Sequence, residues 1–526
     1  MQRTKYEEFN GPKQIAKQIL YCIILSFSML EAGAQSLGVG TMAFEDYYRR
    51  SQLAGGLDSA ISFTLRPLSL SFSDSISSRQ GLSVYGSSAT KNNVQVLPVM
   101  WQHQYYANPT DIRNDGLMIP AKGYQTMLSA GAFAKLGPLR IQLRPEFVFA
   151  ANNDHEVRAY HYGAMDLPSR FGDRSYSQLS WGQSSISLNF DPVSVGLSNE
   201  NLWWGPGMQN SLLMSNTSPG FKHLTLNTSR PVRTPAGSFE AQIVAGRLEG
   251  SGVGNSLPED WRYLSGLAFS YQPKWVPGLF LGLTRSFQIY HEDMDDSFGD
   301  IFPIFQAFQK VKTNEDTKPR DQLTSLFARW LIPAARAEVY FEYGLNDHSY
   351  NTRDFLMAPE HSRAYILGMN KLIPYKQRPG EFIQFSAEIT RMEQSIDRVV
   401  RDAWEWYTHS QLLHGYTHKG QVLGAGIGPG GNLQSLQIGW VRGLDRLGVQ
   451  LERYEHNGDL AYVFGFSPWI DISMSTIADW TFKRFLLSGK LQGMQSINYQ
   501  WKDGIDGRAK RNVFNINARL GIMYSF

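Results

Sequence analysis

Two parts of the sequence gather large aromatic side chains, amides and hydroxyls around closely spaced turns. The first runs from Asn199 to Pro231, where Trp203 and Trp204 come directly before Gly205-Pro206-Gly207 and a second turn follows at Pro219-Gly220. Because proline lacks a backbone donor and glycine permits positive φ, turns this close together exclude a long helix or a central strand. The sequence therefore predicts a shaped loop that carries two large flat side chains.

The second part runs from Ser395 to Gly430 and ends in a glycine-rich segment. Val399, Ala403, Trp406 and Leu413 recur at near-helical spacing, which predicts a helix before that segment. The same part of the chain concentrates aromatic rings and imidazoles: Trp404, Trp406, Tyr407, His409, His414, Tyr416 and His418. Side chains of these types place flat apolar faces next to hydrogen-bonding groups.

Neither part contains a recognisable catalytic or metal-binding arrangement. Three histidines suggest a metal ion, but no H-E-x-x-H or H-x-E pairing occurs, so hydrogen bonding is their favoured role. The acidic segment His291 to Asp300 lacks the D-x-D-x-D-G spacing of a calcium loop. There is no G-x-S-x-G nucleophile elbow, and no pair of carboxylates stands out for glycoside cleavage. We therefore predict no enzyme activity, no metal and no cofactor.

The chemistry that suits both parts is carbohydrate binding. A sugar ring offers an apolar C–H face that stacks on Trp or Tyr, and hydroxyls that need polar partners. The candidate polysaccharide-binding residues are Asn201, Trp203, Trp204, Asn210, Asn216, Trp404, Trp406, Tyr407, His409, Tyr416 and His418. The alternative for the paired tryptophans is that they pack inside a barrel lumen or at a membrane interface.

β-Strands are the elements that must position these loops. From about Ser59 the apolar residues recur with a period of two, which gives each strand one apolar and one polar face. One example is Ile383, Phe385, Ala387 and Ile389, which alternate with Gln384, Ser386, Glu388 and Thr390. Counting such runs gives roughly eighteen strands, and each needs about ten residues to cross a bilayer at a tilt.

Three features favour a membrane barrel over a soluble sandwich with the same alternation. Short turns, such as Leu136-Gly137-Pro138 and Gly443 to Arg446, alternate with long polar loops, as in outer-membrane barrels. The last strand alternates up to Phe526, which resembles the terminal assembly signal of bacterial outer-membrane barrels. The polar faces mix basic and acidic side chains, which suits a wet lumen, and we place there Arg140, Arg144, Arg336, Glu338 and Glu342.

The N-terminus has the pattern of an export signal. Lys13 and Lys17 precede an apolar run, and Ala32-Gly33-Ala34 supplies small residues for cleavage after Ala34. The only cysteine, Cys22, lies in that run, so the mature chain has no disulfide. A helical pattern follows from Ala43 to Leu53 and ends at Gly55-Gly56.

These observations predict an all-β membrane protein in three parts. Residues 1–34 are a signal peptide, 35–57 an N-terminal periplasmic helical segment, and 58–526 the outer-membrane barrel. The barrel is a single antiparallel transmembrane β-barrel of about 18 strands, and its long extracellular loops plug the mouth. The formal net charge of +3 argues against nucleic acid as a partner.

Several short blocks of the sequence occur in a particular combination. They are Asn201 to Gly207, Asn210-Ser211-Leu212, Ser215-Asn216, Pro219-Gly220-Phe221, His223-Leu224, Gly246 to Glu249 and the segment from Gly415 to Gly430. In this combination the sequence resembles the capsule assembly protein Wzi family. The resemblance implies an outer-membrane barrel with a periplasmic helical element, and a lectin-like role that holds capsular or related polysaccharide at the cell exterior.

The leading hypothesis is therefore a non-enzymatic outer-membrane protein that binds surface polysaccharide and helps attach or assemble it. Its partners would be that polysaccharide, the lipid bilayer of the outer membrane and the barrel assembly machinery. The alternative is a saccharide channel or porin, favoured by the strand number and by the charged side chains assigned to the lumen. A third hypothesis, an outer-membrane hydrolase, rests only on the histidine-rich segment. Single-channel conductance separates a plugged lectin from a porin.

Overall fold

The computed structural model describes residues 35–526 apart from 71–91, 109–112, 157–164, 254–256, 259, 296, 307–317, 347–351, 358, 396–402, 404 and 503–510. The predicted signal peptide, 1–34, lies outside the described residues. The helices are α2 (Met42–Leu53), α3 (Phe298–Ile301), α4 (Thr352–Met357) and α5 (Gly458–Phe464), with short 3-10 turns η3 (His291–Asp293), η4 (Pro303–Phe305), η5 (Pro333–Ala335) and η7 (Tyr499–Trp501). Among the described residues, no helix is long and apolar enough to cross a membrane.

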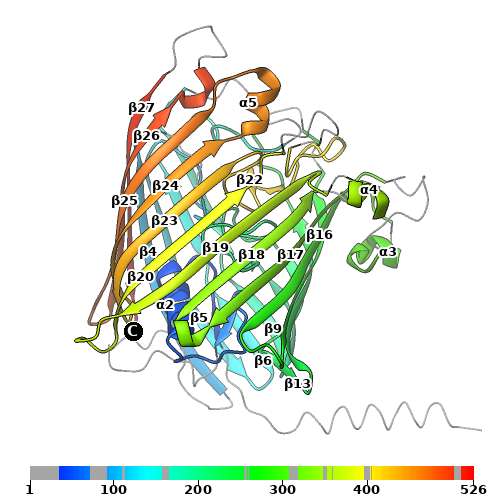
Figure 1. Cartoon of the computed structure of the whole chain (residues 1–526). Helices are drawn as coiled ribbons and strands as arrows, with labels where there is room; N and C mark the ends of the chain where they lie inside the picture. Colours follow the sequence, from blue (N-terminus) through cyan, green and yellow to red (C-terminus); the bar gives the residue numbers. More distant parts are fainter. Residues whose placement is uncertain are drawn as a thin grey trace, which may run out of the picture.

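Antiparallel strands form a closed barrel (Figure 1). They are β4 (Asn92–Tyr106), β5 (Gly123–Leu136), β6 (Leu139–Leu143), β7 (Glu146–Ala150), β8 (Tyr176–Ser180), β9 (Ser185–Phe190), β10 (Val193–Ser198), β12 (His223–Thr228), β13 (Val232–Thr234), β14 (Gly237–Leu248), β15 (Arg262–Pro273), β16 (Leu279–Tyr290), β17 (Arg320–Ile332), β18 (Ala337–Asn346), β19 (Arg363–Pro374), β20 (Glu381–Arg391), β23 (Asn432–Arg442), β24 (Asp445–His456), β25 (Trp469–Phe482), β26 (Phe485–Ile497) and β27 (Val513–Tyr524). Pairing of β27 with β4 closes the wall. The predicted barrel class is confirmed.

Three of the wall strands are interrupted, so the segments make up 18 strands, as the sequence predicts. β6 pairs with β9 and β7 pairs with β8, so each of these two strands is made of two segments. β12 and β13 are the two segments of the third strand, and both pair with β14. Pro145 lies in the first interruption and Pro231 in the third, where a proline cannot donate to the ladder. Gly182, at φ 53°, lies between β8 and β9.

The two ends of the barrel differ in the length of their connections. At the end that carries the C-terminus the strands are joined by short turns, including those predicted at Gly137-Pro138 and at Gly443 (Figure 1). Both glycines adopt positive φ, 60° and 56°, which tight turns of this kind require. The long connections all lie at the opposite end, which in an outer-membrane barrel faces the cell exterior.

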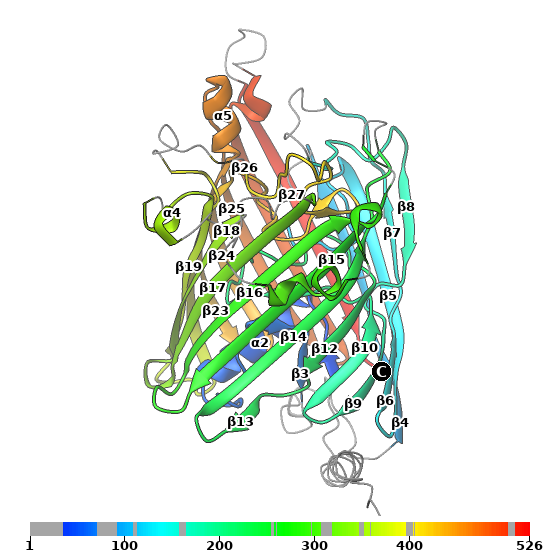
Figure 2. The ribbon, with the colours of Figure 1, turned by 90° about the vertical axis from the view of Figure 1, so that its right-hand side faces the viewer.

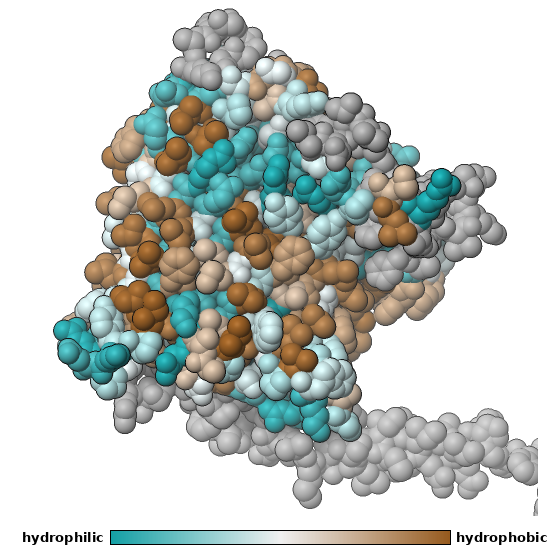
Figure 3. Space-filling view, in the orientation of Figure 1, coloured by the Kyte–Doolittle hydropathy of each residue, from teal (hydrophilic) through white to brown (hydrophobic). Residues whose placement is uncertain are grey.

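The outer face of the wall is apolar and the inner face is polar. Val339 and Phe341 of β18 are 42% exposed, whereas Glu338 and Glu342 of the same strand are fully buried. Figure 3 shows apolar side chains spread over the outer wall, with hydrophilic residues gathered toward the loop end. Exposed apolar and buried charged side chains reverse the pattern of a soluble protein and suit a wall that faces lipid.

Two details of the predicted alternation differ in the structure. Arg336, placed in the lumen, is exposed in the turn between β17 and β18, because the chain turns there at φ 47° before β18 begins. On β16 the outward-facing Phe287 and Ile289 are buried. The segment that contains α3 and η4 lies against the outside of β15 and β16 and covers them (Figure 2).

The alternation can be tested with one matched pair of substitutions on β20. Phe385→Arg is expected to cost about 2–4 kcal/mol of stability, because a cation then faces the middle of the bilayer. Ser386→Arg is expected to cost much less, since Ser386 faces the lumen and donates to Asn370 Oδ1 at 3.0 Å. Urea unfolding midpoints in lipid vesicles measure both; equal losses would contradict the assignment of faces.

The N-terminal helix α2 lies inside the barrel at the short-turn end (Figures 1 and 2). Glu45 in its first turn and Arg50 in its last turn complement the helix dipole, and Gly55 at φ 81° follows its end. Phe44, Tyr48 and Leu53 are buried against the inner wall. The predicted helix from Ala43 to Leu53 is therefore confirmed, and it fills part of the lumen.

Buried ion pairs join α2 to the wall. Arg49 Nε lies 2.6 Å from Glu338 Oε1, and Arg329 NH2 lies 2.6 Å from the other carboxylate oxygen. Gln384 Nε2 donates to Asp46 Oδ1 at 2.9 Å, and Arg446 NH1 lies 3.7 Å from Asp46 Oδ2. Charges buried in this way are stabilised only when paired, so the lumen-facing charges position the helix.

Candidate functional site

The loop between β10 and β12 turns back into the lumen. Its residues Trp203–Trp204 form the short strand β11, which pairs with β2 (Leu65–Arg66) from the N-terminal segment. A side chain at Gly205 would meet the buried carboxylate of Glu342, since an added Cβ would lie 2.6 Å from Oε2; the residue also has φ 114°. Only glycine fits there, which explains Gly205 in the block Trp204-Gly205-Pro206-Gly207.

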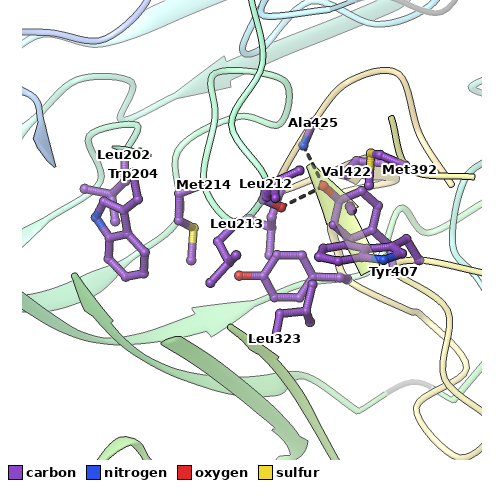
Figure 4. Close-up of a cluster of buried hydrophobic side chains, with 14 of the residues drawn as sticks. Leu202, Trp204, Leu212, Leu213, Met214, Leu323, Met392, Tyr407, Val422 and Ala425 are labelled. Atoms are coloured by element: carbon purple, nitrogen blue, oxygen red, sulfur yellow. Dashed lines mark hydrogen bonds between the residues drawn. The ribbon is translucent and has the colours of Figure 1, made fainter. Parts of the chain in front are cut away.

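Trp204 lies in the core of this plug. Its ring is fully buried, and its Nε1 donates to Gln242 Oε1 at 2.8 Å. Gly266 leaves room for the indole, because an added Cβ would lie 2.5 Å from Cη2. Figure 4 shows Trp204 beside Leu202 and Met214 in a cluster of buried hydrophobic side chains. In this structure no face of its ring is open to a sugar.

The three candidate amides of the loop also bond to other residues of the protein. Asn201 donates to Ser218 O at 2.7 Å, and Asn210 donates to Thr390 Oγ1 at 3.1 Å. Asn216 Nδ2 donates to Asn114 O at 2.9 Å. These bonds hold the shape of the loop.

A lumen-facing carboxylate anchors the turn after Gly207. Glu388 of β20 accepts backbone N–H bonds from Met208, Gln209 and Asn210 at 2.7, 3.1 and 2.9 Å, and a hydroxyl bond from Tyr340 at 2.9 Å. Four donors on one buried carboxylate fix the position of the loop in the barrel.

Residues Trp406 to Tyr416 pack against the loop that contains Trp203 and Trp204. Trp406, Tyr407 and Tyr416 are buried, and the rings of Tyr407 and Tyr416 stack with centroids 5.8 Å apart. The Tyr407 hydroxyl donates to Leu212 O at 2.7 Å and accepts from Ala425 N at 2.8 Å (Figure 4). These aromatic side chains join the two loops into one plug. Trp404 lies outside the described residues.

The helix predicted in this stretch is wrong for its described part. Residues 405–431 form turns and the two short strands β21 (Thr417–His418) and β22 (Gln421–Val422), and none of them is helical. Tyr407 at φ 68° and Gly415 at φ 61° break the helical path. The apolar spacing arose instead from side chains that pack against the other loop. Val399 lies outside the described residues.

The histidines act as hydrogen-bonding partners, as predicted. His418 Nδ1 accepts from Glu249 N at 3.0 Å, and His409 Nδ1 accepts from Leu412 N at 3.1 Å. His414 Nδ1 lies 2.9 Å from the Tyr290 hydroxyl, and burial lowers the His414 pKa to about 4. Burial also lowers the His418 pKa well below its ordinary value. No group of three or more His, Cys, Asp or Glu side chains that could hold a metal occurs among the described residues.

Two of the candidate residues border a cavity of about 310 Å³ beside the plug. Trp203 and Asn216 line it from the plug, α2 lines it from below, and the wall around β4, β5 and β24 to β27 encloses it. The guanidinium of Arg66 lies 4.3 Å from the centroid of the Trp203 ring. Of the candidate residues that the structure describes, His409 is the one that is partly exposed.

The charged residues of this cavity were not predicted as site residues. Arg113 comes from the loop between β4 and β5, and Lys490 and Arg519 from β26 and β27. A signal was present for Arg519, which stands on the polar face of the alternating last strand. Its proximity to Lys490 and Arg113 depends on strand pairing and loop folding, which the local pattern does not specify.

A closed 18-strand barrel with an apolar outer face, short turns at one end and a lumen filled by α2 and inward-folded loops is a plugged outer-membrane-type β-barrel. Residues 107–501 match the family of capsule assembly protein Wzi. That match spans more than half of the chain, which therefore belongs to the Wzi family.

The fold is similar to that of one solved structure at a TM-score above 0.5, and other matches score lower. Wzi of Escherichia coli, described as an outer-membrane protein involved in group 1 capsule assembly and a carbohydrate-binding β-barrel, gives a TM-score of 0.61 at 13% identity, covering 94% of this chain and 100% of that chain. Pseudomonas aeruginosa OccK2 in complex with glucuronate gives 0.41 at 9% identity, covering 82% and 97%. A BenF-like porin from Pseudomonas fluorescens gives 0.41 at 10%, covering 82% and 98%. No curated protein sequence matches this chain.

Proposed function

We propose that this protein is a lectin-like protein of the outer membrane that binds capsular or related surface polysaccharide and helps attach or assemble it at the cell surface. Membership of the Wzi family across residues 107–501 is the observation that carries the proposal. The carbohydrate binding described for the Escherichia coli relative supports it. The plug supports it too, because α2 and two long loops fill much of a lumen that a porin leaves open.

The proposal extends to export and assembly. Residues 1–34 act as a signal peptide that is cleaved after Ala34, and β27 with Phe526 presents the assembly signal to the barrel assembly machinery. The outer wall then contacts the lipid bilayer. We also propose that the protein is not an enzyme, since its buried histidines and carboxylates are engaged in holding the plug.

The sugar-binding region is proposed at the plug and its rim. The buried candidates Trp204, Trp406, Tyr407, Tyr416 and His418 act by holding the loops in shape. His409 contacts the polysaccharide directly, because it is partly exposed at the loop end. Trp404 is proposed as a stacking residue on the basis of the sequence alone.

Retention of polysaccharide by cells tests this function. Cells that lack the protein are expected to release polysaccharide into the medium, and His409→Ala is expected to restore retention less well than the unchanged protein. Trp275→Ala is the control, since it removes an aromatic side chain, 71% exposed, from a short turn at the opposite end. Full retention in cells without the protein would refute the role. Large, steady single-channel currents from the purified barrel would favour the porin alternative.

A further inference from the structure

Two cations face each other on the inner wall. Lys490 of β26 and Arg519 of β27 are directly paired in register, and both line the luminal cavity. Like charges directly opposite one another destabilise a sheet. The side-by-side position of these two cations therefore reduces the local stability of the sheet. Features that reduce local stability in this way concentrate at functional sites.

A third cation completes the cluster. Arg113, from the loop between β4 and β5, also borders the cavity. Its NH2 lies 3.3 Å from Glu452 Oε2, and Arg519 NH1 lies 2.7 Å from Asp115 Oδ1. Among the described residues Lys490 has no comparably close carboxylate: its Nζ donates to the neutral amide of Gln450 at 2.9 Å and lies 3.9 Å from Glu452. In the part of the chain that the structure describes, these three cations thus share two nearby carboxylates, Glu452 and Asp115.

The three cations stand at the junction of two spaces. Arg113, Lys490 and Arg519 line both the cavity of about 310 Å³ and a smaller adjoining one of about 40 Å³. Their side chains are 20%, 26% and 32% exposed, and all three border both spaces. The cations are therefore available to a solute in the lumen. We call this junction, with Glu452, the cationic neck.

The larger cavity below the neck offers groups suited to hydroxyls. Gln104, Gln209 and Gln450 contribute amides, and Trp203 contributes an aromatic ring. The Trp203 Nε1 and the Ser129 hydroxyl are buried yet have no hydrogen-bond partner among the described residues. Buried donors of this kind are normally satisfied, here by whatever fills the cavity. A volume near 300 Å³ is at the lower end for small-molecule sites.

We propose that the cationic neck and this cavity bind one acidic sugar unit, with its carboxylate at Lys490, Arg113 and Arg519 and its hydroxyls among the amides and Trp203. Guanidinium and ammonium groups bind carboxylates through charge-assisted hydrogen bonds. The choice of a saccharide rests on the proposed function; the choice of an anion rests on the cationic neck alone. The site is separate from the rim around His409.

Isothermal titration of the purified barrel with D-glucuronate and with D-glucose tests the proposal. Glucuronate is expected to bind and glucose to bind far more weakly. Lys490→Gln is expected to weaken glucuronate binding about tenfold or more, because it removes a charge-assisted hydrogen bond. Heat-modifiable migration on gels confirms that the variant is folded.

Arg453→Gln is the matched control. Arg453 follows Glu452 on β24 and so faces the outside of the wall, where it pairs with Glu455 at 2.8 Å. Its substitution makes the same change of charge and is expected to leave glucuronate binding unchanged. Equal binding of glucose and glucuronate, equal losses in both variants, or equal binding of inorganic phosphate would overturn the acidic-sugar site. If polysaccharide binds both variants while glucuronate binds neither the variants nor the unchanged protein, the luminal site fails and the proposed function stands.

Discussion

Glu338→Gln is expected to lower the free energy of unfolding of the plugged barrel by about 3–5 kcal/mol, because it leaves two buried guanidinium groups without their shared carboxylate. Arg49 of α2 and Arg329 of β17 each lie 2.6 Å from an oxygen of Glu338, and all three side chains are buried. Arg329 also donates to Ser62 O and Gln52 Oε1, both at 2.8 Å. Removing the negative charge therefore weakens the attachment of α2 and of the segment that follows it.

Glu342→Gln is the control for this prediction. Glu342 lies on the same strand and the same inner face, is equally buried, and accepts a hydrogen bond from the neutral Ser325 hydroxyl at 2.8 Å. An amide can still accept that bond, so the expected cost is below about 1.5 kcal/mol. Unfolding midpoints measure both variants, and planar-bilayer recordings show whether loosening of α2 admits ions. Equal stability of the two variants would mean that the ion pairs do not hold α2.

The wall of the barrel was predictable because its pattern is local. The alternation from Ile383 to Thr390 indicates directly which side chains face lipid. Successive side chains of a strand point to opposite faces, and the bilayer favours apolar side chains on one of them. The tight turn at Gly137 is equally local, because glycine supplies the positive φ that the turn requires. Strand number follows from counting such signals, even where Pro145 interrupts a strand.

The sequence predicted that long loops plug the mouth, but not which side chains of the loop around Gly205 face inward. Gly205 and Pro206 exclude regular structure, but the same turn suits a tryptophan pair that faces solvent and one that faces inward. Its direction depends on distant residues: Glu388 accepts the N–H bonds after Gly207, and Gly266 leaves room for Trp204. Neither position carries a sign of this role in the sequence. The near-helical spacing around Trp406 predicted a helix that is not there. Its apolar residues pack against distant parts of the chain, so their spacing does not reflect a local helix.

The cationic neck was predictable in part: the sequence indicates which way its strand residues face, but not that they lie together. Arg519 and Lys490 each occupy inward positions of an alternating strand, so their side is readable from the sequence. Their direct opposition needs the register between β26 and β27, which the hydrophobic pattern fixes only after the strands have been paired. Arg113 reaches them from a long loop, whose fold has no comparable periodic signal.

Trp204→Ala is expected to cost about 3–5 kcal/mol, because it deletes a fully buried indole at the centre of the plug. The cavity it leaves is bounded by Gly266 and by the cluster shown in Figure 4, and Gln242 loses its donor. Trp204→Phe keeps much of the packing but removes the donor together with one ring of the indole, so its expected cost is smaller, about 1–3 kcal/mol.

The pair of variants at Trp204 separates support of the plug from sugar contact when unfolding midpoints are measured together with cell-retained polysaccharide. Because the ring is covered by protein, Trp204→Ala is expected to reduce retention only in step with its loss of stability, and Trp204→Phe correspondingly less. Barrel bands on heat-modifiability gels show that the wall stays folded, since its backbone bonds run between strands rather than through the plug. Unchanged stability of Trp204→Ala with a selective loss of polysaccharide would contradict the buried role and show that the indole contacts sugar after the plug has opened.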